Sequence, residues 1–162
     1  MMKKLLFSIF AIAGICTANA QETKFGAKAG LAMITVEQTV TMGGVTVTAS
    51  GSETGFFAGG FVEIGVNDTF SIQPELLYVG ISDFNMINLP ILGKFTFAEK
   101  FSAMAGPGIT YMLDAEEDEF KVNVDIAAGY EITESLDVTA RYSLGFGDVK
   151  VGGFYAGVGY KF

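Results

Sequence analysis

The sequence predicts an all-β fold, an eight-stranded antiparallel up-and-down transmembrane β-barrel that follows a cleaved signal peptide. Three observations lead to this prediction. Apolar and polar residues alternate with a period of two over about eight segments, as in strands with one apolar face. Each segment has about ten to thirteen residues, which suits tilted strands that cross a bilayer. The connections between the segments are alternately short and long, as in outer-membrane barrels.

The first twenty residues are predicted to be a secretory signal peptide. Lys3 and Lys4 give it a basic start, and a short apolar run, 5–15, follows. That run is too short to span a bilayer. Ala20 and Gln21 flank the expected cleavage site, because the residues before it follow a small-x-small pattern. The predicted division of the chain is a signal peptide, 1–20, and an outer-membrane β-barrel domain, 21–162.

The lengths of the connections predict where the chain ends lie. The turns at 67–68, 98–100 and 133–135 are tight, whereas the other connections are longer. Short turns face the periplasm in outer-membrane barrels, so an even number of strands puts both termini on the periplasmic side. The first long connection contains a candidate hairpin that extends the first two strands, 36–41 and 45–50. The predicted strands are 24–35, 55–66, 69–80, 86–97, 101–112, 120–132, 136–146 and 153–162.

The apolar face of these strands is predicted to point outward, toward lipid. Its aromatic rings are too many for the interior of an eight-stranded barrel, which ordinary side chains already fill. The rings also gather near both ends of the strands, as the aromatic girdles of membrane barrels do. The outward set is Phe25, Phe56, Phe70, Tyr78, Phe95, Phe97, Phe101, Tyr111, Tyr130, Tyr142, Phe146, Phe154, Tyr160 and Phe162.

The opposite face is rich in glycine and charge, and it is predicted to line a narrow polar lumen. Burying an unpaired charge is costly, so the inward charges are expected to form ion pairs that plug the lumen. Pro74 and Pro107 fall within strands, and a local bulge is expected at each. Depth counted from the short turns suggests four pairs: Lys28–Glu63, Glu75–Lys94, Asp125–Arg141 and Asp137–Lys161.

The sequence offers little for catalysis. It has no histidine, and its one cysteine lies in the predicted signal peptide, so nucleophilic triads and the usual zinc ligands are missing. We therefore predict no enzyme activity and no cofactor. An acidic run between the fifth and sixth strands could bind calcium, or it forms a solvated loop that bridges lipopolysaccharide through divalent ions. The candidate calcium ligands are Asp114, Glu116, Glu117, Asp118 and Glu119.

Several stretches carry a family resemblance. The most specific is Gln-Pro-Glu-Leu-Leu-Tyr at 73–78, and the others are glycine–aromatic segments at 25–31, 87–92, 105–108, 140–145 and 157–162. Together they resemble the PorT-like outer-membrane β-barrel domain family of Gram-negative bacteria. The resemblance implies an eight-stranded barrel in the outer membrane and no single activity. The last strand, with Val158, Tyr160 and Phe162 at alternate positions, looks like the signal that the outer-membrane assembly machinery reads through strand addition.

The expected role is that of a small outer-membrane barrel with a structural or interaction function, a plugged lumen and exposed acidic loops. Two alternatives stay open at this point. One is a narrow pore or carrier for small molecules across the outer membrane, and the other is a soluble periplasmic lipocalin-like binding barrel. The expected partners are outer-membrane lipid, lipopolysaccharide and, during insertion, the assembly machinery. The net charge of −8 excludes nucleic acid.

Overall fold

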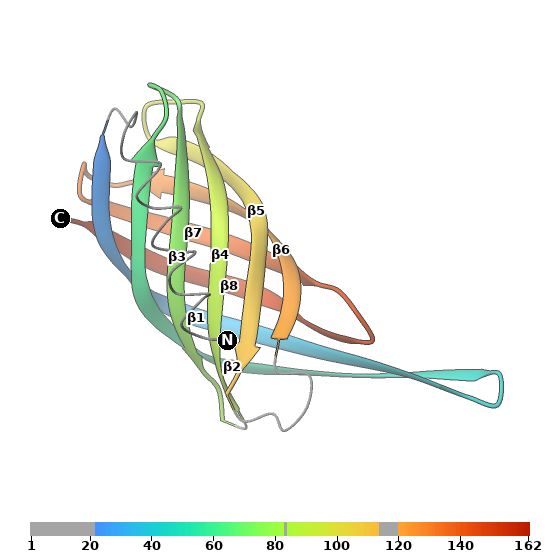
Figure 1. The fold of residues 1–162 in the computed structure, drawn as a ribbon. Helices are drawn as coiled ribbons and strands as arrows, with labels where there is room; N and C mark the ends of the chain where they lie inside the picture. The colour runs from blue at the N-terminus through green and yellow to red at the C-terminus, as the bar shows by residue number, and fades with distance from the viewer. Residues whose placement is uncertain (1–21, 83, 114–119) are drawn as a thin grey trace, which may run out of the picture.

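The computed structural model describes residues 22–82, 84–113 and 120–162, and these form one closed antiparallel barrel (Figure 1). Each strand pairs with the next along the chain, and the last pairs with the first, which confirms the predicted up-and-down topology. No helix within these residues is long and apolar enough to cross a membrane. The strands are β1 (Thr23–Met42), β2 (Val45–Gly65), β3 (Phe70–Gly80), β4 (Asn85–Thr96), β5 (Phe101–Met112), β6 (Phe120–Glu131), β7 (Leu136–Gly145) and β8 (Val149–Lys161).

The first two strands are longer than the bounds predicted from the sequence. The candidate hairpin is their direct continuation, because β1 and β2 pair in one register from Thr23↔Ile64 to Met42↔Val45. Gly43 and Gly44 form the turn with φ values of 59° and 81°, as a two-residue turn with both φ angles positive requires. The paired ends of β1 and β2 project beyond the rest of the barrel (Figure 1).

Strand β8 also begins earlier than predicted, at Val149 rather than at 153. The extension of β1 gives it a partner, since Gln38 pairs with Val149 and Glu37 pairs with Lys150. Gly152, which lies outside the predicted bounds, is therefore part of the strand.

The two faces of the wall point as predicted. Most rings of the predicted outward set are exposed, and Phe70 and Tyr111 are half-buried. The charged side chains of Lys28, Glu75 and Arg141 are buried inside the barrel. An apolar outer surface around a charged interior is the reverse of a water-soluble barrel and is the arrangement of a membrane barrel.

The bulges expected at Pro74 and Pro107 are absent. A bulge adds one residue to one strand and shifts the pairing by one position. Here the register is unchanged across both prolines, so each proline only removes its own N–H from the ladder. The flanking pairs are Phe61↔Glu75 and Ile64↔Ile72 around Pro74, and Pro90↔Gly108 and Gly93↔Ala105 around Pro107.

Candidate functional site

The lumen is filled by three groups of side chains stacked along the barrel. The loop-side cluster is apolar and lies toward the long connections. The central cluster contains buried ion pairs, and the turn-side ring closes the end where the short turns lie. The loop-side cluster is Ala32, Ile34, Phe57, Leu77, Val79, Ile81, Met86, Val151 and Tyr155. The central cluster is Lys28, Gln73, Glu75, Asn88, Thr110, Asn123, Asp125 and Arg141, and the turn-side ring is Glu63, Lys94, Glu131 and Lys161.

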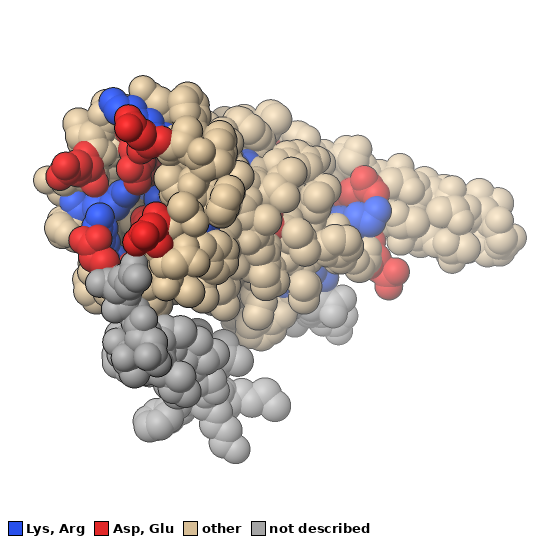
Figure 2. Space-filling model, turned by 90° about the horizontal axis from the view of Figure 1, so that it is seen from above, with Lys and Arg blue, Asp and Glu red and all other residues tan. Residues whose placement is uncertain are grey.

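The turn-side ring alternates acid and base around the mouth. Lys94 Nζ lies 3.0 Å from Glu63 Oε2 and 3.4 Å from Glu131 Oε1. Lys161 Nζ lies 2.6 Å from Glu131 Oε1 and 3.8 Å from Glu63 Oε2. The four residues come from β2, β4, β6 and β8, so the ring connects strands that are not neighbours in the wall. Figure 2 shows basic and acidic side chains gathered at the end of the barrel away from the β1–β2 projection.

The central cluster is built around one buried carboxylate. Lys28 Nζ donates to Glu75 Oε1 at 2.5 Å, and Arg141 Nη1 donates to Glu75 Oε2 at 3.3 Å. Gln73 Nε2 donates to Glu75 Oε1 at 2.7 Å. The Glu75 side chain is only 1% exposed, and both cations are buried as well. A charge this deep is tolerated only when it is paired and hydrogen-bonded, and Glu75 meets both conditions.

A chain of neutral amides and a hydroxyl links the central ion pairs to Asp125. Arg141 Nη2 donates to Asn88 Oδ1 at 3.0 Å, and Asn88 Nδ2 donates to Thr110 Oγ1 at 2.9 Å. Thr110 Oγ1 donates to Asn123 Oδ1 at 3.2 Å, and Asn123 Nδ2 donates to Asp125 Oδ2 at 2.8 Å. The chain runs from β7 to β4, β5 and β6, so it crosses the lumen and ties opposite walls together.

Aromatic rings lie against both buried cations. The Arg141 guanidinium lies over the Tyr155 ring, with 4.2 Å between its Cζ and the ring centroid. Lys28 Nζ lies 5.2 Å from the centroid of Phe61. Tyr155 also meets Phe57 edge to face, with 5.7 Å between the ring centroids. Such contacts favour a desolvated cation, so they stabilise the central cluster where water is excluded.

Glycines make room for these inward rings. Gly26 pairs with Phe61 and Gly30 pairs with Phe57 across β1 and β2. A Cβ at Gly26 would lie 2.3 Å from Phe61 Cζ, and a Cβ at Gly157 would lie 2.5 Å from Phe57 Cζ. Phe61 therefore packs over Gly26 of the neighbouring strand β1, and Phe57 packs over Gly157 of β8, two strands away. An aromatic ring over a glycine is a recurrent way to stabilise glycine in sheets.

The structure corrects the predicted ion pairs while keeping their residues in the lumen. All eight predicted residues are on inward positions, but their partners differ. Lys28 contacts Glu75, Lys94 contacts Glu63, and Lys161 contacts Glu131 and Glu63. Arg141 contacts Glu75 in place of Asp125, and Asp137 accepts a hydrogen bond from Thr139 Oγ1 at 3.2 Å.

The depth count failed because it ignored the stagger between tilted strands. In the observed register Glu63 pairs with Lys24, and Lys28 pairs with Gly59. The long side chains of lysine and arginine then reach across the lumen to strands that are not adjacent. Sequence reasoning also missed the amides of Asn88 and Asn123, because it followed charge alone.

A small cavity lies inside the barrel. It lies beside the central cluster and is lined by Lys28, Glu75, Thr139, Arg141 and Tyr155 together with apolar side chains. Its volume of about 10 Å³ is room for about one water molecule. Among the described residues, no group of three or more histidine, cysteine, aspartate or glutamate side chains could hold a metal ion. Two sets of predicted site residues lie outside the described part of the chain. They are the candidate calcium ligands Asp114, Glu116, Glu117, Asp118 and Glu119, and the cleavage-site residues Ala20 and Gln21.

The barrel is closed, its outer wall is apolar and its interior is charged. These features together define a small membrane-spanning β-barrel. The chain belongs to the outer membrane protein beta-barrel domain family, whose model matches residues 5–162. It is therefore an outer-membrane barrel. A search of curated protein sequences finds no significant match.

Solved structures of other small barrels share the fold. A de novo designed transmembrane β-barrel matches with a TM-score of 0.55 and 11% identity over 88% of this chain and 99% of that one. Ail, the attachment invasion locus protein of Yersinia pestis, in complex with the heparin analogue sucrose octasulfate, matches with a TM-score of 0.52 and 18% identity over 88% and 100%. Neisserial surface protein A matches with a TM-score of 0.52 and 16% identity over 88% and 100%. At these identities the likeness concerns the fold alone.

Proposed function

We propose that this barrel is a closed, non-catalytic outer-membrane scaffold whose role is structural or consists of interactions made by its exposed loops. The observation that carries the proposal is the filled lumen. The turn-side ring and the Lys28–Glu75–Arg141 group both cross the barrel from wall to wall. The loop-side cluster fills the other end with apolar side chains, and the cavity beside the central cluster has a volume of about 10 Å³.

The energetics of the central cluster also support a closed lumen. An ion that passed would have to displace Lys28 or Arg141 from Glu75. Breaking a buried ion pair costs about 3–5 kcal/mol, because the remaining charge is left without a partner. The loop-side cluster adds a second, independent barrier. A narrow pore would require both the central cluster and the loop-side cluster to rearrange. A lipocalin-like binding barrel does not fit a wall whose aromatic rings face outward.

Planar-bilayer recordings test the closed lumen. We expect no stable single-channel steps from the purified protein. Flotation of the same preparation with liposomes, and a shift of the folded band on heating before gel electrophoresis, show that inserted and folded protein was present. Stable, reproducible conductance steps from such a preparation contradict the closed lumen and favour the pore.

Membrane orientation and processing complete the proposal. Both termini lie in the periplasm, residues 1–20 are removed as a signal peptide, and the barrel domain is 21–162. Val158 and Tyr160 lie on the outer face of β8 and the exposed Phe162 follows its last residue, where the assembly machinery could pair with the last strand. The narrower PorT-like resemblance and the contact of the acidic loop with lipopolysaccharide or calcium belong to this proposal as well. A protease that digests an epitope inserted at Gly43–Gly44 on intact cells, and spares one at the C-terminus, supports the orientation.

A further inference from the structure

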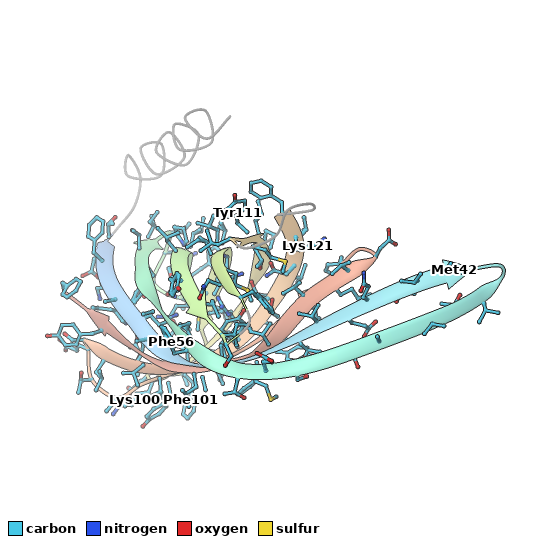
Figure 3. All side chains as sticks on the ribbon, turned by 90° about the horizontal axis from the view of Figure 1, so that it is seen from below. Met42, Phe56, Lys100, Phe101, Tyr111 and Lys121 are labelled. Carbon is cyan, nitrogen blue, oxygen red and sulfur yellow. The ribbon has the colours of Figure 1, made fainter. Side chains whose placement is uncertain are left out.

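The projecting hairpin carries no charge at its tip although the chain is strongly acidic. Residues 38–52 contain no aspartate, glutamate, lysine or arginine, whereas the net charge of the chain is −8. Met42 lies at the tip of the projection, and Lys100 and Phe101 lie at the opposite end of the barrel (Figure 3). A neutral surface here is where two copies of an acidic protein could meet without electrostatic repulsion.

One edge of this hairpin is open. Strand β2 pairs with β3 only from Phe56↔Gly80 onward, so within the described part of the chain residues 45–52 pair with β1 alone. The other edge is partly covered, because β8 pairs with β1 as far as Gln38 and Thr39 N donates to Asp148 O at 3.2 Å. Natural edge strands are usually protected by lysine, proline or a bulge. Residues 45–52 have none of these and pair with β1 in an uninterrupted register.

The side chains of the hairpin are complementary to one another. One face carries hydroxyl groups and the other carries apolar side chains, so residues of the same kind pair across β1 and β2. The hydroxyl oxygens of Thr39 and Thr48 lie 3.3 Å apart, and those of Thr41 and Thr46 lie 3.1 Å apart. On the other face Val40 pairs with Val47 and Met42 pairs with Val45, and all four side chains are exposed. A lone two-stranded ribbon is marginally stable, whereas a sheet of three or more strands with an apolar face is stable.

We propose that the open edge of β2 binds the same edge of a second copy of this chain. The two β2 strands pair antiparallel about a twofold axis near Thr48 and make a four-stranded sheet. Thr46 of one copy then lies opposite Ser50 of the other, which repeats the hydroxyl pairing already present between Thr35 and Ser52 at 2.9 Å. Antiparallel pairing points the two barrels in opposite directions, so the contact joins two membranes head to head.

The chemistry of the edge favours a second copy over another class of partner. A basic partner would find no carboxylate within residues 38–52, and an acidic partner would find no lysine or arginine. The alternation of threonine and valine is matched by its own sequence read in the reverse direction. This inference deepens the interaction role proposed above, and it does not depend on whether the lumen conducts.

Sedimentation equilibrium in density-matched micelles tests the pairing. We expect the wild type to form dimers reversibly, and Thr48→Lys to weaken dimerisation at least about tenfold, because two lysines would face each other across the twofold axis. Thr39→Lys is the matched control, since Thr39 is the register partner of Thr48 on the same face but lies on β1, away from the proposed β2–β2 contact. We expect it to change the dissociation constant by less than about threefold. A monomeric wild type, or equal effects of the two lysines, would overturn the proposal.

Proteoliposomes test the head-to-head arrangement. With Cys16→Ser as background, we expect Thr48→Cys to form an intermolecular disulfide between differently labelled vesicles, and Thr39→Cys not to form one. Cross-links confined to copies within one vesicle, or equal cross-linking by the two cysteines, contradict head-to-head pairing. Conductance is measured separately, so a conducting barrel that still pairs would refute only the closed lumen.

Discussion

Lys161 on β8 donates to Glu131 Oε1 on β6 at 2.6 Å, across the intervening strand β7. The same lysine also approaches Glu63 on β2 at 3.8 Å. The ring is therefore complete only when the last strand has closed the barrel against β1, because β8 supplies one of its two cations. Lys161 thus links closure of the wall to neutralisation of two carboxylates at the mouth.

Loss of Lys161 should destabilise the barrel moderately. In Lys161→Met both glutamates keep only Lys94, but they are half-buried and partly solvated, which reduces the penalty. We expect the free energy of unfolding to fall by about 1–2 kcal/mol, measured by urea titration in micelles. Lys24→Met is the control, since Lys24 forms an exposed pair with Glu22 at 3.4 Å and should contribute less than about 1 kcal/mol. Equal effects of the two substitutions would refute a structural role for the ring.

The central cluster should be far more sensitive than the ring. Glu75→Gln keeps the shape of the side chain but removes the one carboxylate that both Lys28 and Arg141 contact in a buried site. We expect a loss of about 3–5 kcal/mol, or failure to fold, judged by heat-modifiable migration and urea titration. The double variant Glu75→Gln/Lys28→Met removes one cation as well and should recover part of this stability. A double variant that is no better than Glu75→Gln would show that charge balance is not what matters there.

The glycine at position 26 should be required for the inward Phe61 ring. A Cβ there would overlap the ring and also lie 2.7 Å from the backbone oxygen of Tyr160. We expect Gly26→Ala to cost about 1–3 kcal/mol through overpacking. Gly60→Ala is the control on the outer face, where the nearest atom to an added Cβ is 3.5 Å away. We expect that change to stay within about 0.5 kcal/mol, and a comparable loss at both positions would contradict the account.

The strands could be predicted well because the membrane requires apolar and polar residues to alternate along each of them. A residue such as Ile126 must face lipid and its neighbour Asp125 must not, so alternation identifies both the strand and its faces. This alternation is less informative outside the membrane, where neither face of a strand has to be apolar. Thr39 and Val40 alternate as well, and the hairpin predicted there extends the first two strands, but the pattern did not show that β2 runs without interruption through 51–54.

The interior could be predicted only as a set of residues. Pairing in the lumen depends on stagger and on the reach of side chains across the barrel, and neither is visible along one strand. Arg141 reaches Glu75 across the lumen, 66 positions away in sequence. Phe57 and Phe61 share the face of Glu63 by alternation but were not singled out, and the space for their rings comes from glycines on other strands. Gly26, opposite Phe61, is a signal that could have indicated that ring once the register was known.

The measurement that tests the central claim most directly is the folding free energy of Ile126→Lys in lipid bilayers. The claim is that the apolar wall faces lipid while the charged residues face the axis, and Ile126 is half-exposed on that wall. We expect a loss of about 2–4 kcal/mol near the middle of the bilayer, and Val40→Lys on the water-exposed hairpin should lose less than about 0.5 kcal/mol. If Ile126→Lys is tolerated as well as Val40→Lys, this wall does not face lipid and the account is wrong.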